Sequence, residues 1–304
     1  MRRFSPLIFC LLVALMLPGC QTPIAVTLTP VPSQVTPSPF PSATSLPSST
    51  PTAQDTATPT PVPCMETHGK IFNVDIPTDQ LNQPVNTNIY LPPCYDPDSD
   101  TGYPVLFMFH GQAATNDQWI RLGLTNAADE LITQKVIQPM IIVMPFEVTW
   151  TPGPEESRFD EAFMQDVLSF VESEYAVCAQ RSCRAVGGLS RGGNWAVYLG
   201  FAYPELFGTI GAHSTPLFYG EVFRINQAAG KVASFAELPW VIVDMGDRDA
   251  QKDKVLEFTA ALQDAGIPFD FYPFEGRHEE SYWGAHVADY LQWYSDRFIV
   301  PPQD

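Results

Sequence analysis

The chain has 304 residues, with 16 lysines and arginines against 34 aspartates and glutamates and a formal net charge of −18. Proteins that bind nucleic acids hold the phosphates with clustered Lys and Arg side chains, so this acidity excludes a nucleic-acid partner. Apolar residues make up 45% of the chain, which is enough for a sizeable core. The 30 prolines are concentrated near the start, and the chain therefore divides into segments of different composition.

Residues 1–20 are predicted to form a secretory signal. Two arginines precede an apolar run at residues 7–17, and that run is too short to span a membrane. The segment ends in the sequence LPGC, which resembles the lipobox of bacterial lipoproteins. The resemblance implies that Cys20 is lipidated, becomes the mature N-terminus and anchors the protein outside the cytoplasm on the bacterial cell membrane. An ordinary cleaved signal, with Cys20 incidental and the protein secreted, is the alternative.

Residues 21–63 are predicted to be a disordered tether. They contain 11 prolines and 16 serines and threonines, with Asp55 as the single charged residue and no glycine. Such a composition cannot form a core, and proline-rich chain favours the extended polyproline II conformation. At about 3.1 Å per residue, the tether reaches at most about 130 Å. The folded body is therefore expected to begin near Cys64.

Residues 64–304 hold 14 basic and 33 acidic side chains and are long enough for one domain. Four cysteines remain in this body, an even number in a chain predicted to reach an oxidising compartment, which favours disulfides. Proximity in the sequence favours pairing Cys178 with Cys183 and Cys64 with Cys94, among three connectivities. A zinc site is the alternative, but zinc ligands come in close pairs and only one pair here is close, so no metal site is predicted.

The predicted elements of the body alternate between strands and helices. In chain order, alternating polar and apolar residues indicate antiparallel edge strands at residues 70–76 and 86–91. Four continuously apolar runs are typical of strands buried on both faces, at residues 105–109, 140–144, 185–189 and 240–245. Apolar residues three and four apart indicate helices at residues 159–175, 255–262 and 287–298. This order predicts an α/β fold with a mostly parallel central sheet, right-handed crossovers and flanking helices.

The sequence GGLSRGGNW at residues 187–195 contains Gly-x-Ser-x-Gly between a predicted buried strand and a predicted helix. This is the context of a nucleophile elbow, in which the chain turns so sharply that side chains at Gly188 and Gly192 would clash. The strained turn exposes the hydroxyl of Ser190 at a helix N-terminus, where backbone N–H groups stabilise an oxyanion. Ser190 is therefore the candidate nucleophile, and a tight glycine-rich turn without a catalytic role is the alternative.

A serine hydroxyl needs a histidine base and a carboxylate to become nucleophilic at neutral pH. In α/β-hydrolases the acid follows the serine along the chain and stands on a loop after a strand. The predicted strand that ends near residue 245 continues into a loop with two aspartates. Asp249, three residues beyond Gly246, is the candidate acid. Asp247 is the alternative, and Asp244 is expected to lie inside the strand.

Five histidines compete for the role of base. His278 follows a strand-like run at residues 269–274 and precedes the last helix, which gives the chain order serine, acid, base. His213 comes before any candidate acid, and His286 is expected within the last helix. His278 is therefore the candidate base.

The second oxyanion donor of such a site comes from the loop after the third strand. Here His110, Gly111 and Gln112 follow the apolar run at residues 105–109. The backbone N–H groups of Gln112 and Arg191 are therefore the predicted oxyanion hole. His110 itself is expected to be a structural polar anchor.

Together these motifs resemble an esterase branch of the α/β-hydrolase superfamily that contains esterase D (S-formylglutathione hydrolase), feruloyl esterases, enterochelin esterases and mycolyltransferases. The resemblance spans nearly all of residues 70–298. It rests on HG at residues 110–111, GLSRGG at 188–193, GDRD at 246–249, GRH at 276–278 and YW at 282–283.

This resemblance implies an α/β-hydrolase fold, with Ser190 as nucleophile, Asp249 as acid, His278 as base and the backbone amides of Gln112 and Arg191 for the oxyanion. It also implies hydrolysis without a metal or organic cofactor. Members of the branch differ widely in substrate, so the resemblance implies the reaction type rather than the specificity.

A few residues are candidates for contacts with the substrate. Arg191, Arg248 and Arg277 neighbour the three triad candidates and are candidates for a pocket that binds a carboxylate or phosphate, with pairing to nearby acids as the alternative. Trp283 and three other tryptophans are candidates for an aromatic or sugar site, with a place in the core as the alternative.

The sequence thus predicts an extracytoplasmic serine carboxylic-ester hydrolase that acts on small-molecule or carbohydrate esters, acyl or feruloyl esters among them. An acyltransferase of the mycolyltransferase type, in which a sugar alcohol replaces water, is one alternative. A non-catalytic surface lipoprotein that binds glycans is another, but such a protein has no need of Ser190, Asp249 and His278 together.

Overall fold

The computed structural model describes residues 64–147, 153–218, 220–231 and 237–300. These residues belong to one compact unit that covers Pro61–Asp304. The predicted signal at residues 1–20, with Cys20, and the tether at residues 21–63 lie outside the described residues and stay predictions. Within the described ranges, no helix has both the length and the apolar composition that crossing a membrane requires.

The described residues form one sheet of eight strands in the order β1-β2-β4-β3-β5-β6-β7-β8. β1 and β2 run antiparallel at one edge, and β4, β3, β5, β6, β7 and β8 are mutually parallel. The predicted α/β architecture with antiparallel N-terminal edge strands is therefore confirmed. The strands are β1 (Lys70–Ile76), β2 (Val85–Leu91), β3 (Val105–Phe109), β4 (Ile141–Pro145), β5 (Arg184–Leu189), β6 (Thr209–His213), β7 (Trp240–Gly246) and β8 (Phe269–Phe274).

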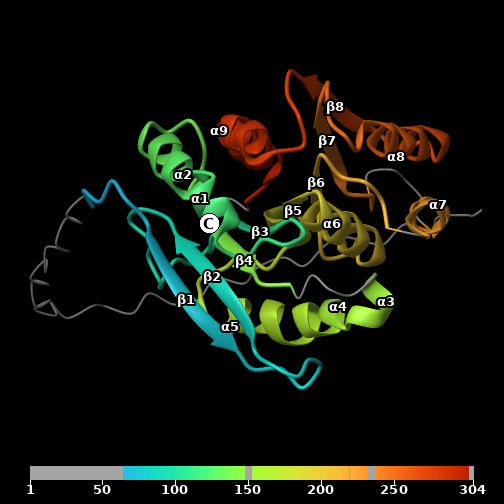
Figure 1. Cartoon of the computed structure of the whole chain (residues 1–304). Helices are drawn as coiled ribbons and strands as arrows, with labels where there is room; N and C mark the ends of the chain where they lie inside the picture. Colours follow the sequence, from blue (N-terminus) through green and yellow to red (C-terminus); the bar gives the residue numbers. More distant parts are fainter. Residues whose placement is uncertain (1–63, 148–152, 219, 232–236, 301–304) are drawn as a thin grey trace, which may run out of the picture. The chain divides into compact units, whose positions relative to one another are not determined.

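Helices follow most of the parallel strands and return the chain to the sheet (Figure 1). They are α1 (Gln118–Arg121), α2 (Leu124–Thr133), α3 (Pro154–Ser157), α4 (Phe159–Ala162), α5 (Leu168–Glu174), α6 (Arg191–Ala202), α7 (Glu221–Lys231), α8 (Lys252–Asp264) and α9 (Glu280–Arg297). The helix predicted at residues 159–175 is observed as α4 and α5 joined by a π-helical segment, Phe163–Val167.

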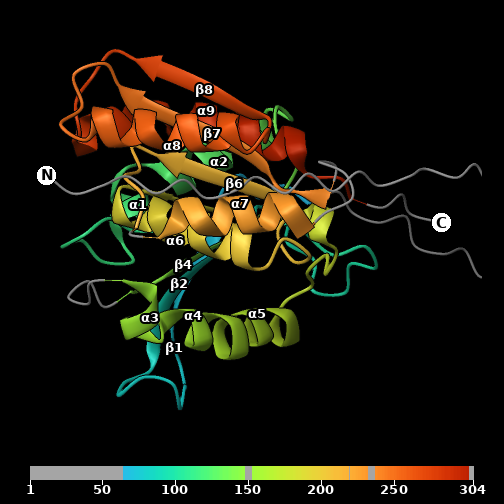
Figure 2. The same ribbon diagram turned by 90° about the vertical axis from the view of Figure 1, so that its right-hand side faces the viewer.

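Two hydrophobic cores lie on the two faces of the sheet. Successive residues of β3 point to opposite faces: Leu106 and Met108 pack with the core under α1, α2 and α9, whereas Phe107 and Phe109 pack with the core under α4 to α8. The two helix layers are visible in Figures 1 and 2. Both faces of β3, β4, β5 and β7 are therefore covered, which explains the apolar runs in their sequences, whereas β8 at the edge of the sheet is partly exposed.

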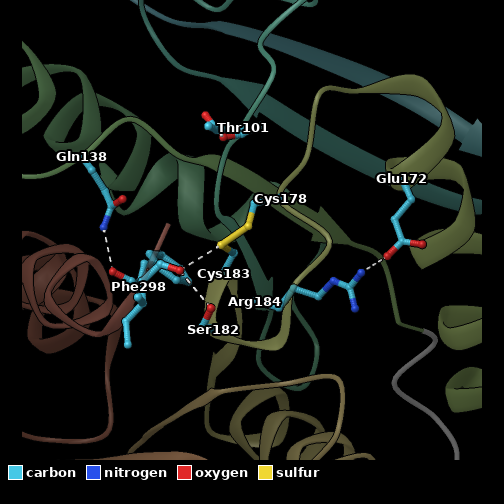
Figure 3. The surroundings of a disulfide bond; sticks show 10 residues. Thr101, Gln138, Glu172, Cys178, Ser182, Cys183, Arg184 and Phe298 are labelled. Carbon is cyan, nitrogen blue, oxygen red and sulfur yellow. Dashed lines mark hydrogen bonds and ion pairs between the residues drawn. A yellow bond between two sulfur atoms is a disulfide. The ribbon is translucent and has the colours of Figure 1, made fainter. Parts of the chain in front are cut away.

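Two disulfides, Cys64–Cys94 and Cys178–Cys183, confirm the predicted pairing. The second lies just before β5, where the end of α9 is fastened to the same segment (Figure 3). Ser182 and residue 299 exchange hydrogen bonds of 2.9 Å, Ser182 through its hydroxyl and its carbonyl oxygen. Near the same place, Arg184 pairs with Glu172 of α5. These contacts tie the amino end of β5 to helices on both faces, at the end of the strand opposite to Ser190.

Candidate active site

Ser190 stands between β5 and α6 with φ 51° and ψ −118°. Residues other than glycine rarely adopt such a positive φ. A hydrogen bond of 2.8 Å from the N–H of Ser190 to the carbonyl oxygen of His213 stabilises this strained conformation. A Cβ atom at Gly188 would lie 2.4 Å from the carbonyl carbon of Gly192, and one at Gly192 would lie 2.2 Å from the carbonyl oxygen of Phe109. The predicted steric reason for both glycines is confirmed.

The structure brings Ser190, His278 and Asp249 together from three loops at the carboxyl ends of β5, β8 and β7. The Nε2 atom of His278 lies 2.9 Å from the Oγ atom of Ser190. The Nδ1 atom lies 3.0 Å from each carboxylate oxygen of Asp249. These distances allow the imidazole to bridge the hydroxyl and the carboxylate, as a serine, histidine and acid triad requires.

The Asp249 carboxylate has the properties of an ionised partner for the imidazole. Burial raises the pKa of Asp249, but hydrogen bonds from His278 and from the Gln251 N–H, together with the attraction of the imidazole, outweigh burial and hold the pKa below its ordinary value. An ionised Asp249 accepts the Nδ1–H proton of His278, which leaves Nε2 free to accept the hydroxyl proton of Ser190.

Asp247, the alternative acid, serves a different purpose. Its Oδ1 atom accepts the N–H of Gly276 over 3.0 Å, and its own N–H donates to the carbonyl oxygen of Phe274 over 2.7 Å. The N–H of Arg248 donates to the carbonyl oxygen of Gly276 over 3.0 Å. Asp247 and its neighbour therefore join the loop that carries Asp249 to the loop that carries His278.

The other histidines have other partners. His213 is buried beside Asp244, which lies inside β7 as expected, with Nδ1 2.6 Å from the carboxylate. His286 lies within α9 as expected, and His68 is at the opposite edge of the sheet beside Asp129. Of the five, His278 is the one that reaches Ser190.

The predicted oxyanion donors both line a cavity of about 300 Å³ beside Ser190. Gln112 lies in the turn after Gly111, whose N–H donates to the side-chain oxygen of Gln118 over 2.8 Å. Arg191 is the first residue of α6, and the first N–H groups of a helix have no partner inside the helix. Both backbone N–H groups therefore belong to segments that border the same cavity as the Ser190 hydroxyl.

Glu147, which the sequence reasoning missed, connects these two segments. Its carboxylate receives two hydrogen bonds, of 2.8 and 2.9 Å, from the buried guanidinium of Arg191. Its N–H donates to the Nε2 atom of His110 over 2.9 Å, so His110 is the structural anchor that was expected. Burial raises the pKa of Glu147 although the Arg191 guanidinium opposes this. No sequence signal marked Glu147, because 44 residues separate it from Arg191.

Two of the three arginines predicted to contact the substrate are occupied by acidic side chains of the protein. The Arg191 guanidinium is bound to Glu147, and that of Arg248 pairs with Glu275 at 3.0 Å and Asp247 at 3.5 Å. The alternative interpretation, pairing with nearby acids, is therefore confirmed for Arg248, whereas Arg191 pairs with an acid 44 positions away that was not foreseen. The exposed Arg277 side chain forms no hydrogen bond or ion pair within the described ranges.

Trp283 is buried and does not line the cavity next to Ser190. Its ring stands perpendicular to the imidazole of His278, with the ring centroids 5.0 Å apart. The structure therefore corrects the prediction of an aromatic substrate site at Trp283, because this buried side chain packs against the imidazole of His278.

The cavity beside Ser190 is lined by both polar and apolar residues. Its remaining lining residues are Asn194, Pro216, Leu217, Phe218, Gln251 and Lys254. Phe218 also borders a larger groove of about 530 Å³ between α3 and α7. Among the described residues, no cluster of three or more His, Cys, Asp or Glu side chains has the arrangement of a metal site.

The described residues thus combine an α/β-hydrolase fold with a serine, a histidine and an aspartate in mutual contact. The sequence pattern of the family described as "Putative esterase" matches residues 78–294, and the chain therefore belongs to this esterase family.

Known proteins with similar sequence or structure carry related descriptions. An endo-1,4-beta-xylanase/feruloyl esterase of Xylanibacter ruminicola is 25% identical over 223 residues, which cover 70% of this chain and 29% of that protein. The solved structure of a ferulic acid esterase superposes with a TM-score of 0.68 at 23% identity, over 76% of this chain and 99% of the other. A ferulic acid esterase of Anaeromyces mucronatus in complex with ferulic acid gives a TM-score of 0.62 at 17% identity, over 76% of this chain and 91% of the other.

The expected family and fold are thus confirmed.

This chain spans about a third or less of the length of the Xylanibacter protein and of the next three curated relatives. The solved structures share less than 25% of their residues with this chain and support the fold alone.

Proposed function

We propose that this protein hydrolyses carboxylic esters through an acyl-enzyme on Ser190. His278 takes the hydroxyl proton as Ser190 attacks the ester carbonyl, and Asp249 stabilises the imidazolium. The backbone N–H groups of Gln112 and Arg191 hold the oxyanion of the tetrahedral intermediate. His278 then protonates the leaving alcohol and activates a water molecule that releases the acid. The observation that carries this proposal is the continuous contact from Ser190 Oγ through His278 to Asp249.

We further propose that the substrates are acyl or feruloyl esters of carbohydrates. The cavity beside Ser190 is small enough to select the acyl group, and Phe218 connects it to the larger groove. That groove combines the exposed ring of Phe223 with polar side chains, among them Arg224, whose guanidinium carbon lies 4.2 Å from the centroid of the buried Tyr198 ring. Aromatic faces next to hydrogen-bonding groups suit the apolar and polar sides of a sugar ring. The feruloyl esterase descriptions of the relatives agree with this substrate class.

We also propose that the enzyme acts outside the cytoplasm and is anchored by a lipid on Cys20. The two disulfides support an oxidising compartment. Mass spectrometry of the membrane fraction tests the anchor: a diacylglyceryl group on Cys20 is expected, and release of Cys20→Ser protein into the medium is the matched control.

The test of the reaction compares wild-type residues 1–304 with Ser190→Ala on p-nitrophenyl acetate to octanoate, methyl ferulate and acetylated xylan. We expect Ser190→Ala to lose at least about 10⁴-fold in kcat/KM while it keeps the wild-type thermal unfolding curve. A fluorophosphonate is expected to label wild-type protein and not the variant.

The same experiment separates the competing functions. Product that forms only when a sugar alcohol is added would favour an acyltransferase. Neither ester hydrolysis nor labelling of the folded wild-type protein would favour a non-catalytic binding protein. Hydrolysis that persists in Ser190→Ala would refute the assignment of the nucleophile.

A further inference from the structure

A second histidine–aspartate pair lies under α9 and takes no part in the proposed reaction. The Nδ1 atom of His213 lies 2.6 Å from one carboxylate oxygen of Asp244, and its Nε2 atom lies 3.0 Å from the hydroxyl of Tyr294. The hydroxyls of Tyr282 and Tyr290 donate to the other oxygen of Asp244 over 2.7 and 2.9 Å. All five side chains are buried. Such a network is rigid because every donor finds an acceptor away from water.

The sheet is shaped to receive this network. Gly187 of β5 and Gly211 of β6 are partners in the parallel ladder. A Cβ atom at either position would come within 2.0 Å of the hydroxyl of Tyr294, at 1.9 and 1.6 Å. The two glycines therefore leave room for that hydroxyl, and the network fixes the position of α9 on the sheet. Gly187 belongs to the glycine-rich motif for this reason and not for the turn at Ser190.

One member of the network also touches the loop that carries His278. Gly276 has φ 155°, and a Cβ atom there would lie 2.5 Å from the Cδ2 atom of Tyr282. On its other side, a Cβ atom at Gly246 would lie 2.4 Å from the carbonyl carbon of Gly276. The loop backbone is therefore enclosed between the end of β7 and the ring of Tyr282, two residues before His278.

We propose that Tyr282, held by its hydrogen bond to Asp244, is a positioning residue that sets the place of His278 relative to Ser190. This inference rests on the proposed function, since it concerns the base of that reaction. Proton transfer needs a close and well-aligned contact, and a displacement of about 1 Å costs up to about 100-fold in rate. Tyr290 donates to the same oxygen of Asp244, but its ring stacks on His213 with the centroids 3.8 Å apart. Tyr290 lies about 12 Å further along α9.

Tyr282→Phe and Tyr290→Phe are therefore a matched pair. Each removes one hydroxyl that donates to the same carboxylate oxygen, and each keeps its ring and its helix. For p-nitrophenyl acetate we expect Tyr282→Phe to lower kcat about 10-fold with KM unchanged, and to slow fluorophosphonate labelling of Ser190 by a similar factor. Tyr290→Phe is expected to change both rates less than about 2-fold. Near-UV circular dichroism and thermal unfolding show that both variants are folded at the assay temperature.

The labelling rate is measured per reactive site, so irreversibly misfolded protein lowers the labelled fraction without lowering the rate, and the unfolding curves exclude reversible unfolding at the assay temperature. Equal rate losses in the two variants would overturn the proposal, because the network would then act through the whole fold. Wild-type rates in Tyr282→Phe would overturn it as well. If wild-type protein neither hydrolyses nor labels, the proposed function fails and this inference falls with it. That outcome is read from the wild type alone and cannot be confused with a result of the variants.

Discussion

Two histidine–aspartate pairs among the described residues, His278 with Asp249 and His213 with Asp244, differ in their surroundings more than in their geometry. In the pair of His278 and Asp249, both nitrogen-to-oxygen distances are 3.0 Å, and the imidazole is 21% exposed with its second nitrogen toward Ser190. In the pair of His213 and Asp244, the distance is 2.6 Å, both side chains are 0% exposed, and the second nitrogen faces a tyrosine. The shorter, more deeply buried pair is thus the one that serves structure.

The comparison teaches that the pair alone does not make a catalytic site. A histidine becomes a base when its second nitrogen faces a hydroxyl in a strained, accessible turn, as at Ser190. When that nitrogen faces the hydroxyl of Tyr294, which packs against Gly187 and Gly211, the histidine stabilises the fold instead. Both aspartates come from one region of the chain, five residues apart, so access and orientation decide the role.

The largest expected effect concerns the pair of His278 and Asp249. Asp249→Asn should lower kcat/KM for p-nitrophenyl acetate about 10⁴-fold, because the amide no longer holds the imidazole in the required tautomer. Asp247→Asn, in the same loop, is the control and should cost less than about 10-fold, since its carboxylate contacts Gly276 and not the imidazole. A larger loss in Asp247→Asn than in Asp249→Asn would reverse the assignment of the acid.

For the buried pair the expected loss is in stability. Asp244→Ala leaves the hydrogen-bond donors of His213, Tyr282 and Tyr290 without their acceptor, and should lower the free energy of unfolding by about 3 to 5 kcal/mol. Urea denaturation followed by fluorescence measures this change. An unaltered midpoint in Asp244→Ala would show that the network does not hold α9 to the sheet.

The dependence of stability on pH sharpens the contrast further. Although burial opposes ionisation of Asp249, the contact with His278 lowers its pKa below the ordinary value of 3.8. A group whose pKa is depressed by folding adds stability above its unfolded pKa and loses it as the pH falls through its folded pKa. The stability advantage of wild type over Asp249→Asn, measured by urea denaturation between pH 7 and pH 2, should therefore begin to decrease near pH 3.8 and vanish once the pH falls below the lower pKa of the folded state. An advantage that is constant over this range would contradict the pKa shift.

The smallest expected effect lies on the surface of the acid loop. Arg248→Ala removes the exposed ion pairs with Glu275 and Asp247, and should change KM for neutral and for carboxylate-bearing esters less than about 2-fold. Kinetics on p-nitrophenyl acetate and on the p-nitrophenyl monoester of succinic acid measure this. A rise of KM only for the anionic ester would restore Arg248 as a substrate contact.

Much of this site could be predicted from the sequence because its strongest signals are local. Gly188 is required by its contact with Gly192 four residues on, and the apolar runs that became β3, β5 and β7 carry their burial in their own composition, whereas Gly192 is required by the distant carbonyl of Phe109. The chain order of the esterase resemblance then placed Asp249 and His278. The disulfide between Cys178 and Cys183 was predictable for the same reason, since only five positions separate the two cysteines.

Long-range contacts escaped the sequence reasoning. Glu147 and Arg191 are 44 positions apart, and nothing local shows that Arg191 is occupied by a carboxylate rather than free for the substrate. The burial of Trp283 behind His278 depends on how α9 packs on the sheet.

The sequence by itself thus determined the class of fold, the esterase motifs and the strained turn at Ser190, because each depends on sterics and hydrophobicity over a few residues. Only the tertiary structure showed that Asp249 and not Asp247 contacts the base, and that the pair of His278 and Asp249 rather than that of His213 and Asp244 meets a serine. Those choices depend on how the loops after β5, β7 and β8 meet at the carboxyl ends of the parallel strands. There Ser190 and His278 are in contact although 88 positions separate them in the sequence. Such meetings are set by packing of whole elements, which no local pattern records.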